Sequence, residues 1–379
     1  MTSRRLAPIL TAILLLPAGV FAQPPSNPDI HAILKNRVWR DDLGIGIVVG
    51  VIDSGGPRVI SFGSAAKNDK RPLNGDTVFE IGSITKEFTS LLLTDMARRG
   101  EVALTDPVSR FLPQDVTTPG RGDRKITLAE LSMHNSGLPR MPTNFKPKDS
   151  GNPYVDYSVE NLYEFLSGHE LTRDIGSQYE YSNLGVGLLG HVLALRAGLS
   201  YEDLVRARIL EPLGMRDTAI TLTPAMKSRL AVGHAESPRT EQNPFGLTAV
   251  ANWDIPTLAG AGALRSTVND MLTFLAANLG FIKTPLAGAI ADQISTPIPS
   301  NNPDFKVGYG WRIQNKFGST IVWHGGATGG YRSYIGFDPQ AKVGVIVLSN
   351  VLMPLVDDIG PHLLNSKYPL SKGSPFDGK

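Results

Sequence analysis

The strand patterns of this chain lie near its two ends, and this distribution restricts the possible folds more than any single motif does. Residues 44–53 (GIGIVVGVID) and 58–63 (RVISFG) predict two strands of a hairpin that turns at Ser54-Gly55-Gly56. Further strands are predicted near the C-terminus, at residues 308–314, 320–324, 331–337 and 343–348. Because both ends supply strands, the simplest architecture is an α/β (α+β) fold in which one antiparallel sheet is flanked by helices.

The region between these strands is helical and rich in loops. Thr127 and Glu130 form a capping-box pattern, and residues 183–197 form a long apolar helical run. Other helices are predicted at residues 29–37, after Ser158, from Ser200 through Leu210, from Ser266-Thr267 and near residues 355–364. We expect a sheet part at about residues 29–85 and 250–379, an inserted helical part at about 86–250, and an active site between the two.

The first 22 residues have the pattern of a secretory signal. Arg4 and Arg5 precede an apolar run at residues 6–16 that is too short to span a bilayer, and the segment ends in the small residue Ala22. A retained membrane anchor is the alternative interpretation. We expect residues 23–379 to form one domain that is periplasmic or secreted and has no stable membrane span after cleavage.

Charge and composition exclude several classes of function. The full chain has a formal charge of +2, and loss of the first 22 residues would remove two arginines and no acid. A neutral chain with 19% charged residues has no electrostatic footprint for nucleic acid. The chain has no cysteine, which excludes disulfides, thiolate catalysis and cysteine metal sites.

Ser83 and Lys86 form the first candidate catalytic element. They lie three residues apart, after Gly82 and before an apolar helical pattern, so the two side chains share one helix face. A serine hydroxyl needs a neighbouring base to become a nucleophile, and a lysine serves as that base when burial or nearby cations lower its pKa. A helix start also supplies free backbone N–H groups for a developing anion. Taken alone, a Ser-x-x-Lys match is also compatible with a surface helix.

Tyr181 and Asn183 form the second element, immediately before a predicted helix. A phenol can transfer a proton between serine, lysine and leaving group, and an asparagine amide can both donate to a substrate carbonyl and accept from a lysine. Alternatively, Asn183 is only a helix N-cap and Tyr181 a core aromatic residue.

The third element is the glycine-rich segment at residues 323–330 (WHGGATGG), which lies between two predicted strands. Gly325 and Gly326 would let backbone approach a ligand closely, and a strand edge there could pair with an amide-containing substrate. The alternative is a glycine-rich hairpin turn with a satisfied histidine at His324.

The three elements together, in this order and at wide spacing, resemble the serine β-lactamase/DD-peptidase superfamily. The closest resemblance is to the class C β-lactamase-like branch, which also contains DD-carboxypeptidases, endopeptidases and family VIII esterases. Residues 79–86 are similar to a class C active-site signature, and residues 131–139 (LSMHNSGLP) to a further family segment. The resemblance covers essentially the whole mature chain and implies a β-lactamase/transpeptidase-like fold with neither metal nor cofactor.

The resemblance also assigns roles by position. It implies that Ser83 is the nucleophile, Lys86 its activating base and Tyr181 the proton-transfer tyrosine. It further implies that the side-chain amide of Asn183 binds the substrate and that the backbone N–H groups of Ser83 and Ala327 form an oxyanion hole. His134 matches a segment that is mainly structural in the family.

Two departures from the family pattern affect the expected substrate. The usual Lys-Thr-Gly is replaced by His324-Gly325-Gly326, and Arg140-Met141 stands where a glutamine is usual. We expect the loss of the lysine and the hydroxyl to weaken recognition of a substrate carboxylate and to allow activity on neutral esters. Arg332, in the following strand, is a possible substitute cation.

The leading hypothesis is a monomeric serine hydrolase that acylates Ser83 with β-lactam or D-Ala-D-Ala-type amides. The substrate would be a small molecule or a peptidoglycan-derived compound. A DD-carboxypeptidase/endopeptidase and a family VIII-type carboxylesterase are alternatives. A non-catalytic penicillin-binding sensor is the hypothesis from a different class, and the intact Ser83, Lys86 and Tyr181 argue against it.

Overall fold

The computed structural model describes residues 24–38, 45–67, 69, 71, 73–241, 243, 246–354 and 356–371. The predicted signal at residues 1–22 lies outside these ranges. Within the described residues, no single helix is both long and apolar enough to cross a membrane. One bent pair, Asn183–Ala197 with Tyr201–Leu213, meets the criteria of length and composition together.

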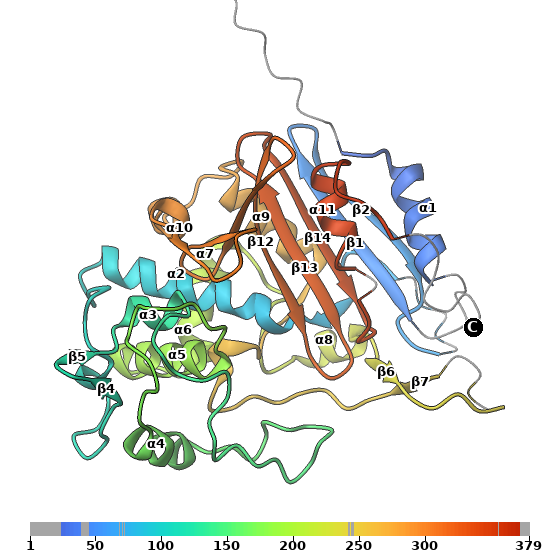
Figure 1. Cartoon of the computed structure of the whole chain (residues 1–379). Coiled ribbons are helices and arrows are strands. Elements are labelled where there is room, and N and C mark those ends of the chain that lie inside the picture. Colours follow the sequence, from blue (N-terminus) through green and yellow to red (C-terminus); the bar gives the residue numbers. More distant parts are fainter. Residues whose placement is uncertain are drawn as a thin grey trace, which may run out of the picture.

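An eight-stranded antiparallel sheet forms the centre of the fold (Figure 1), in the order β2-β1-β14-β13-β12-β11-β10-β9. Its strands are β1 Gly46–Asp53, β2 Gly56–Gly63, β9 Ile298–Pro299, β10 Lys306–Val307, β11 Arg312–Lys316, β12 Ser319–Ala327, β13 Arg332–Asp338 and β14 Val343–Ser349. β1 pairs with β14 from Ile47↔Ser349 to Ile52↔Gly344, so the two ends of the chain are hydrogen-bonded side by side. The predicted α/β fold with one antiparallel sheet from both ends is therefore confirmed.

Helices cover both faces of this sheet (Figure 1). α1 Asn27–Val38 and α11 Ile359–Leu364 pack on one face, and α2 Thr85–Arg98 and α9 Val268–Asn278 lie on the other. Alternation along β1 explains this division, because Val48 and Ile52 enter the core on the α2 side whereas Val49 and Val51 enter the core on the α1 side. β1 is thus a central strand that is apolar on both faces.

The remaining helices gather beside the sheet (Figure 1). They are α3 Leu128–Ser132, α4 Val159–Gly168, α5 Asn183–Ala197, α6 Tyr201–Val205, α7 Glu211–Leu213, α8 Pro224–Arg229 and α10 Ala287–Ser295. Short strand pairs join β3 Val78–Glu80 to β8 Arg265–Thr267, β4 Gly120–Arg121 to β5 Arg124–Lys125, and β6 His234–Glu236 to β7 Leu247–Ala249. The predicted capping box at Thr127 is present, and Ser158 caps α4 as expected.

Three predicted boundaries differ for identifiable reasons. The strand predicted at residues 308–314 starts only at Arg312, because Gly310 has a positive φ of 83° and the preceding residues form a turn. The helix predicted through Leu210 contains a π-helical turn at Arg206–Leu210. Pro212 has no N–H to complete the regular pattern there. Ser266 belongs to β8, and Thr267 alone caps α9.

Candidate active site

Ser83 lies in the 3₁₀ turn Gly82–Ile84, one residue before α2 begins. Gly82 has a φ of 52°, and a Cβ added to it would lie 2.8 Å from both the N and the O atoms of Ala327. A side chain at this position would be excluded on both counts. The glycine therefore brings the backbone at the end of β12 directly against the turn that holds Ser83.

Further contacts hold the backbone beside Ser83 close to β12 and β13. The hydroxyl of Ser333 on β13 donates to the carbonyl of Ile81 at 2.9 Å, and a Cβ on Gly326 would come within 2.1 Å of that carbonyl oxygen. The predicted oxyanion pair, Ser83 and Ala327, is thus held together by close packing of two backbone segments.

Lys86 is fully buried, and its Nζ atom has three oxygen neighbours. It lies 3.1 Å from Ser83 Oγ, 2.9 Å from Asn183 Oδ1 and 2.6 Å from the carbonyl oxygen of Ala261. Burial, with a further contribution from Arg140, lowers the pKa of Lys86 well below its usual value. A neutral amine has two hydrogens and one lone pair, so it can donate to Asn183 and Ala261 and accept the proton of Ser83.

Tyr181 faces the same serine. Its ring centroid lies 4.9 Å from Lys86 Nζ, 5.1 Å from Arg140 Cζ and 5.5 Å from Arg312 Cζ. Burial raises the pKa of Tyr181 to about 12, although its hydrogen bond with Ser83 and the two arginines act in the opposite direction. The phenol is therefore protonated at neutral pH.

The segment that carries Tyr181 is held by His134 and by a helix cap. The backbone N–H of Ser182 donates to His134 Nδ1 at 3.1 Å, and the His134 ring centroid lies 4.6 Å from that of Tyr181. Ser182, and not Asn183, is the N-cap of α5, since its hydroxyl accepts from the N–H of Gly185 at 2.8 Å. The Asn183 side chain is thereby left to contact Lys86.

His324 lies beside Tyr181 but is almost completely enclosed. It is 2% exposed, and its ring centroid is 6.0 Å from that of Tyr181. Its Nδ1 is 2.7 Å from the carbonyl oxygen of Gly325 and must donate to it. Burial, with a further contribution from Arg312, lowers the pKa of His324 well below its usual value, so the ring is neutral at pH 7. His324 therefore offers a substrate carboxylate no cation.

Arg312 supplies positive charge in this region and was not identified from the sequence. Register places it opposite Trp323 in the β11–β12 pair. Its Cζ lies 5.0 Å from the Trp323 ring centroid, 5.2 Å from that of Phe305 and 5.5 Å from that of Tyr181. Its buried Nε has no hydrogen-bond partner, and no carboxylate lies within ion-pair distance of it among the described residues.

Several of these groups line a cavity of about 590 Å³. Its walls include Ser83, Tyr181, Asn183, Arg140, Arg312, Gly325, Gly326, Ala327, Tyr154, Trp253, Trp323 and Arg332. Arg332, named from the sequence only as a possible substitute cation, forms a two-point ion pair with Asp357 that includes an Nε–Oδ1 contact of 2.7 Å. In the part of the chain that the structure describes, no group of three or more His, Asp or Glu side chains is arranged to hold a metal ion.

Sequence reasoning also missed Ala261 and Tyr154. The Ala261 carbonyl accepts from Lys86, and Tyr154 Oη lies 3.4 Å from Asn183 Nδ2. The turn Ala259–Ala261 packs against α5. A Cβ added to Gly187 of α5 would lie 3.0 Å or less from Leu258, and a Cβ added to Gly190 would lie 3.0 Å from the Gly260 Cα. The glycine-rich sequence of residues 260–262 was the available signal for this close approach.

Comparison with known proteins shows the family to which the chain belongs. Residues 36–364 match the family model described as Beta-lactamase. The chain is 27% identical to a Beta-lactamase of Escherichia coli (strain K12), over 89% of this chain and 92% of that protein. It is 30% identical to the D-alanyl-D-alanine-carboxypeptidase/endopeptidase AmpH of the same strain, over 86% of both chains.

Two solved structures share the fold. A Beta-lactamase/D-alanine Carboxypeptidase from Yersinia pestis, complexed with citrate, superimposes with a TM-score of 0.75 at 25% identity, covering 89% of this chain and 97% of that one. A class C beta lactamase from Rhodobacter sphaeroides gives a TM-score of 0.73 at 25% identity, covering 89% and 98%. The chain belongs to the β-lactamase family of serine hydrolases, within the serine β-lactamase/transpeptidase superfamily.

Proposed function

We propose that this protein hydrolyses β-lactam or D-Ala-D-Ala-type amide bonds through an acyl-enzyme on Ser83. The observation that supports this most directly is the 3.1 Å contact between Ser83 Oγ and the fully buried Lys86 Nζ. A neutral amine at hydrogen-bond distance from a serine hydroxyl is a base placed to activate a nucleophile.

The proton path follows from the contacts. Lys86 takes the hydroxyl proton as Ser83 Oγ attacks the substrate carbonyl, and the N–H groups of Ser83 and Ala327 stabilise the resulting oxyanion. Tyr181 hydrogen-bonds Ser83 and passes a proton to the leaving nitrogen as the amide bond breaks, with Lys86 restoring the phenol proton. Water then attacks the ester of the acyl-enzyme by the reverse proton path and releases the acid and free Ser83.

The charge pattern of the cavity favours a substrate that carries a carboxylate. Arg312 and Arg140 both line it, and among the described residues neither has a carboxylate within ion-pair distance. Arg332 is already paired with Asp357, and His324 is neutral. We therefore assign recognition of the substrate carboxylate to Arg312, whose guanidinium is held by three aromatic rings.

Both leading substrate classes meet this requirement. β-Lactams and D-Ala-D-Ala peptides carry a carboxylate close to the scissile amide, whereas a simple ester does not. The similarity to proteins named β-lactamase and D-alanyl-D-alanine-carboxypeptidase/endopeptidase supports the same two classes. Carboxylesterase activity remains the second candidate, because Gly325 leaves the pocket without the hydroxyl that a threonine would provide there. A sensor without turnover is the least supported.

Location and organisation are proposed on sequence grounds. The signal pattern at residues 1–22 supports export to the periplasm or beyond, where peptidoglycan-derived substrates and β-lactams occur. We propose that the mature chain acts as a monomer, with a sheet part at about residues 29–85 and 250–379 and a helical part at about 86–250.

Turnover of three substrates by the same enzyme preparation tests the proposal. The substrates are a chromogenic cephalosporin, a D-Ala-D-Ala peptide and a neutral p-nitrophenyl ester. We expect kcat/KM for at least one of the first two to exceed that for the ester. Turnover confined to the ester would establish the esterase alternative, and one equivalent of product followed by none would establish the binding module.

A pair of arginine variants tests the carboxylate assignment. Arg312→Leu should reduce kcat/KM for a carboxylate-bearing substrate by about 10–150-fold, the worth of a charge-assisted hydrogen bond, and leave the neutral ester much less affected. Arg332→Leu is the matched control, because Arg332 lines the same cavity but is paired with Asp357. It should leave kcat/KM unchanged for both the carboxylate-bearing substrate and the neutral ester. Equal losses on both substrates in Arg312→Leu would refute the assignment.

A further inference from the structure

One end of the central sheet exposes large apolar side chains that the proposed active site does not use. The β1–β2, β11–β12 and β13–β14 turns all lie at this end, as the strand registers require. Phe281 is 39% exposed, Ile282 is 37% exposed and Phe317 is 42% exposed. The hydroxyl of the nucleophile and the backbone of Ala327 lie toward the opposite end of β12.

Phe281 and Ile282 follow the C-terminus of α9 and form one wall of an apolar groove. The groove has a volume of about 670 Å³ and lies between α9 and the β1–β2 hairpin, with Ile52, Pro57, Leu272 and Ala276 among its lining residues. Lys342 Nζ donates to the carbonyl of Leu279 at 2.8 Å and joins this segment to the β13–β14 turn. The groove is therefore part of the same end of the sheet.

Phe317 is an unfavourable residue for its position in the β11–β12 turn. Its φ is 54° and that of Gly318 is 80°, a left-handed pair that is normally occupied by Asn-Gly or Gly-Gly. A non-glycine residue is disfavoured in this region because its Cβ comes too close to the following carbonyl oxygen. The ring packs on Tyr368 at 5.0 Å between centroids, yet a large part of it remains exposed. Packing alone does not account for an aromatic residue at this tip.

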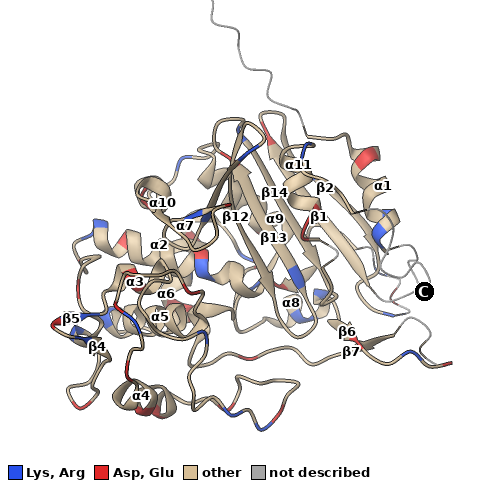
Figure 2. Ribbon diagram, in the orientation of Figure 1, with Lys and Arg blue, Asp and Glu red and all other residues tan. Residues whose placement is uncertain are grey.

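Charge at this end is arranged around the apolar tips. Lys283 follows Ile282, and Lys316 Nζ lies 5.3 Å from the Phe317 ring centroid. Among the described residues, neither lysine has a carboxylate within ion-pair distance. The nearby carboxylates of Asp53 and Asp338 already accept backbone N–H groups, from Gly55 and from Gln340 and Ala341. Figure 2 shows basic and acidic residues otherwise scattered over both the sheet and the helical part.

The beginning of the described chain lies at this same end. Arg58 on β2 donates from Nη1 to the carbonyl of Pro25 at 2.9 Å and to Asn27 Oδ1 at 2.7 Å, beside the groove residue Pro57. The described chain therefore begins at the end of the sheet that exposes Phe281, Ile282 and Phe317.

We infer that this end of the sheet is a lipid-contact surface that rests on an anionic bilayer. Phe281, Ile282 and Phe317 enter the boundary between headgroups and acyl chains, and Lys283 and Lys316 contact lipid phosphates. The catalytic cavity, near the other end of β12, then faces away from the membrane. This inference goes beyond the hydrolytic function and does not depend on it.

Site-specific fluorescence on the full chain tests the inference directly. Because the chain has no cysteine, Ile282→Cys and Val155→Cys can each carry one environment-sensitive fluorophore. Val155 is 46% exposed in the loop before α4 and is the matched control. Vesicles of phosphatidylethanolamine and phosphatidylglycerol should shift the label at position 282 to shorter wavelength and leave the label at position 155 unchanged. Equal behaviour of the two labels, or a shift at position 282 without vesicles from self-association, would overturn the inference.

The lysines and aromatic tips give a second measurement. Lys283→Gln and Lys316→Gln should each weaken vesicle binding of the labelled chain about fivefold on anionic vesicles, with little change on phosphatidylcholine. Phe281→Ser with Phe317→Ser should abolish the shift at position 282 while leaving turnover in solution unchanged. If the chain binds vesicles with the label at position 282 still in water, the N-terminal segment alone anchors it and the surface proposal fails.

Discussion

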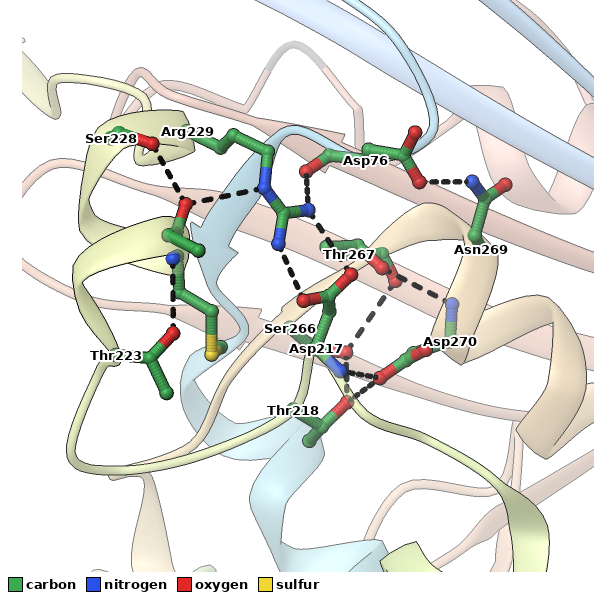
Figure 3. A network of polar contacts seen from close by, with 12 residues as sticks. Asp76, Asp217, Thr218, Thr223, Ser228, Arg229, Ser266, Thr267, Asn269 and Asp270 are labelled. Carbon is green, nitrogen blue, oxygen red and sulfur yellow. Dashed lines mark hydrogen bonds and ion pairs between the residues drawn. The ribbon is translucent and has the colours of Figure 1, made fainter.

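Two polar clusters in this molecule differ in how fully their charges are paired. Around Arg229, all three guanidinium nitrogens are used: Nη1 reaches Asp217 Oδ2 at 3.1 Å and the Asp76 carbonyl at 2.8 Å, Nε reaches the Ala225 carbonyl at 3.3 Å, and Nη2 binds Asp217 Oδ1 (Figure 3). Asp270 accepts from the Asp217 N–H at 2.8 Å and from Thr218 Oγ1 at 2.7 Å in the same network.

The cleft around Ser83 shows the reverse. Lys86, Arg140 and Arg312 all lie around the Tyr181 ring, and no carboxylate forms an ion pair with any of them among the described residues. An excess of like charge at a buried site is unfavourable unless a ligand or a shifted pKa relieves it. The paired network balances the charge of Arg229 with that of Asp217, whereas the unpaired cluster supports the proposals that the cleft binds an anion and that Lys86 is uncharged.

The largest effect should come from removing the nucleophile. Ser83→Ala should reduce kcat by up to ~10⁶-fold, as loss of a nucleophile does in triad-type sites. Intact-protein mass spectrometry after incubation with a penicillin or a fluorophosphonate should show one adduct in the wild type and none in the variant. Ser90→Ala is the matched control, since Ser90 is a buried serine on the same helix whose hydroxyl contacts Ser132 at 2.7 Å. An undiminished adduct on Ser83→Ala would remove Ser83 from the mechanism.

Substitutions of Lys86 and Tyr181 should have strongly non-additive effects on the rate of acylation. Lys86→Ala and Tyr181→Phe should each slow acylation by about 10²–10⁴-fold, the usual worth of a positioned acid or base. The double variant should be little worse than the poorer single variant, because both residues act on the proton of Ser83. Stopped-flow acylation rates for the three variants give this comparison directly. Defects that multiply would show two independent roles.

The unpaired arginines should affect how kcat/KM depends on pH. Lys86 acts when it has lost its proton, so kcat/KM should rise as pH rises through the lowered pKa of Lys86. With the pKa of Tyr181 at about 12, no loss of activity from its ionisation is expected through pH 10. Arg312 contributes to lowering the pKa of Lys86, so Arg312→Leu should move the rise to higher pH.

A neutral ester is the right substrate for this profile, because it separates the effect on Lys86 from the loss of carboxylate binding. Arg332→Leu is again the control, since Asp357 already balances its charge. His134 and His324 both have a pKa held well below its usual value by burial, so they should add no step near the ordinary histidine pKa. If kcat/KM of Arg312→Leu rises at the same pH as that of the wild type, Arg312 does not contribute to the lowered pKa of Lys86.

The contrast between the two clusters also explains what the sequence could predict. Ser83 and Lys86 are close because of one helical turn, and the Tyr181–Asn183 pair is local as well. Local spacing therefore made these residues candidates, and the three elements together made the prediction specific. β1 and β14 could be predicted as strands of one sheet because both are β-branched, apolar runs bounded by turn residues, but their direct pairing was not predicted.

The positions of Arg312 and Ala261 in the cleft could not be predicted from local spacing in the sequence. Arg312 reaches the cleft through the register that sets it opposite Trp323, and a shift of one residue would turn it to the other face. The Ala261 carbonyl accepts from Lys86 only because two glycines of α5 let the turn Ala259–Ala261 approach. Both depend on packing between segments far apart in the chain. The pairing of Arg332 with Asp357 and the burial of His324 are likewise set by tertiary contacts, which sequence spacing does not reveal.

The smallest effect is expected in the paired network, and it should fall on stability alone. Arg229 and Asp217 are 31% and 33% exposed, so solvent screening limits the worth of their ion pair. Arg229→Leu and Asp217→Asn should each lower the free energy of unfolding by about 1 kcal/mol, with a coupling of about 0.5 kcal/mol between them in a double-mutant cycle. Denaturant unfolding measures these changes, and kcat/KM per folded molecule should equal that of the wild type. A tenfold or larger loss of kcat/KM in a folded Arg229→Leu variant would show that the paired cluster also serves the reaction, and the distinction drawn between the two clusters would not hold.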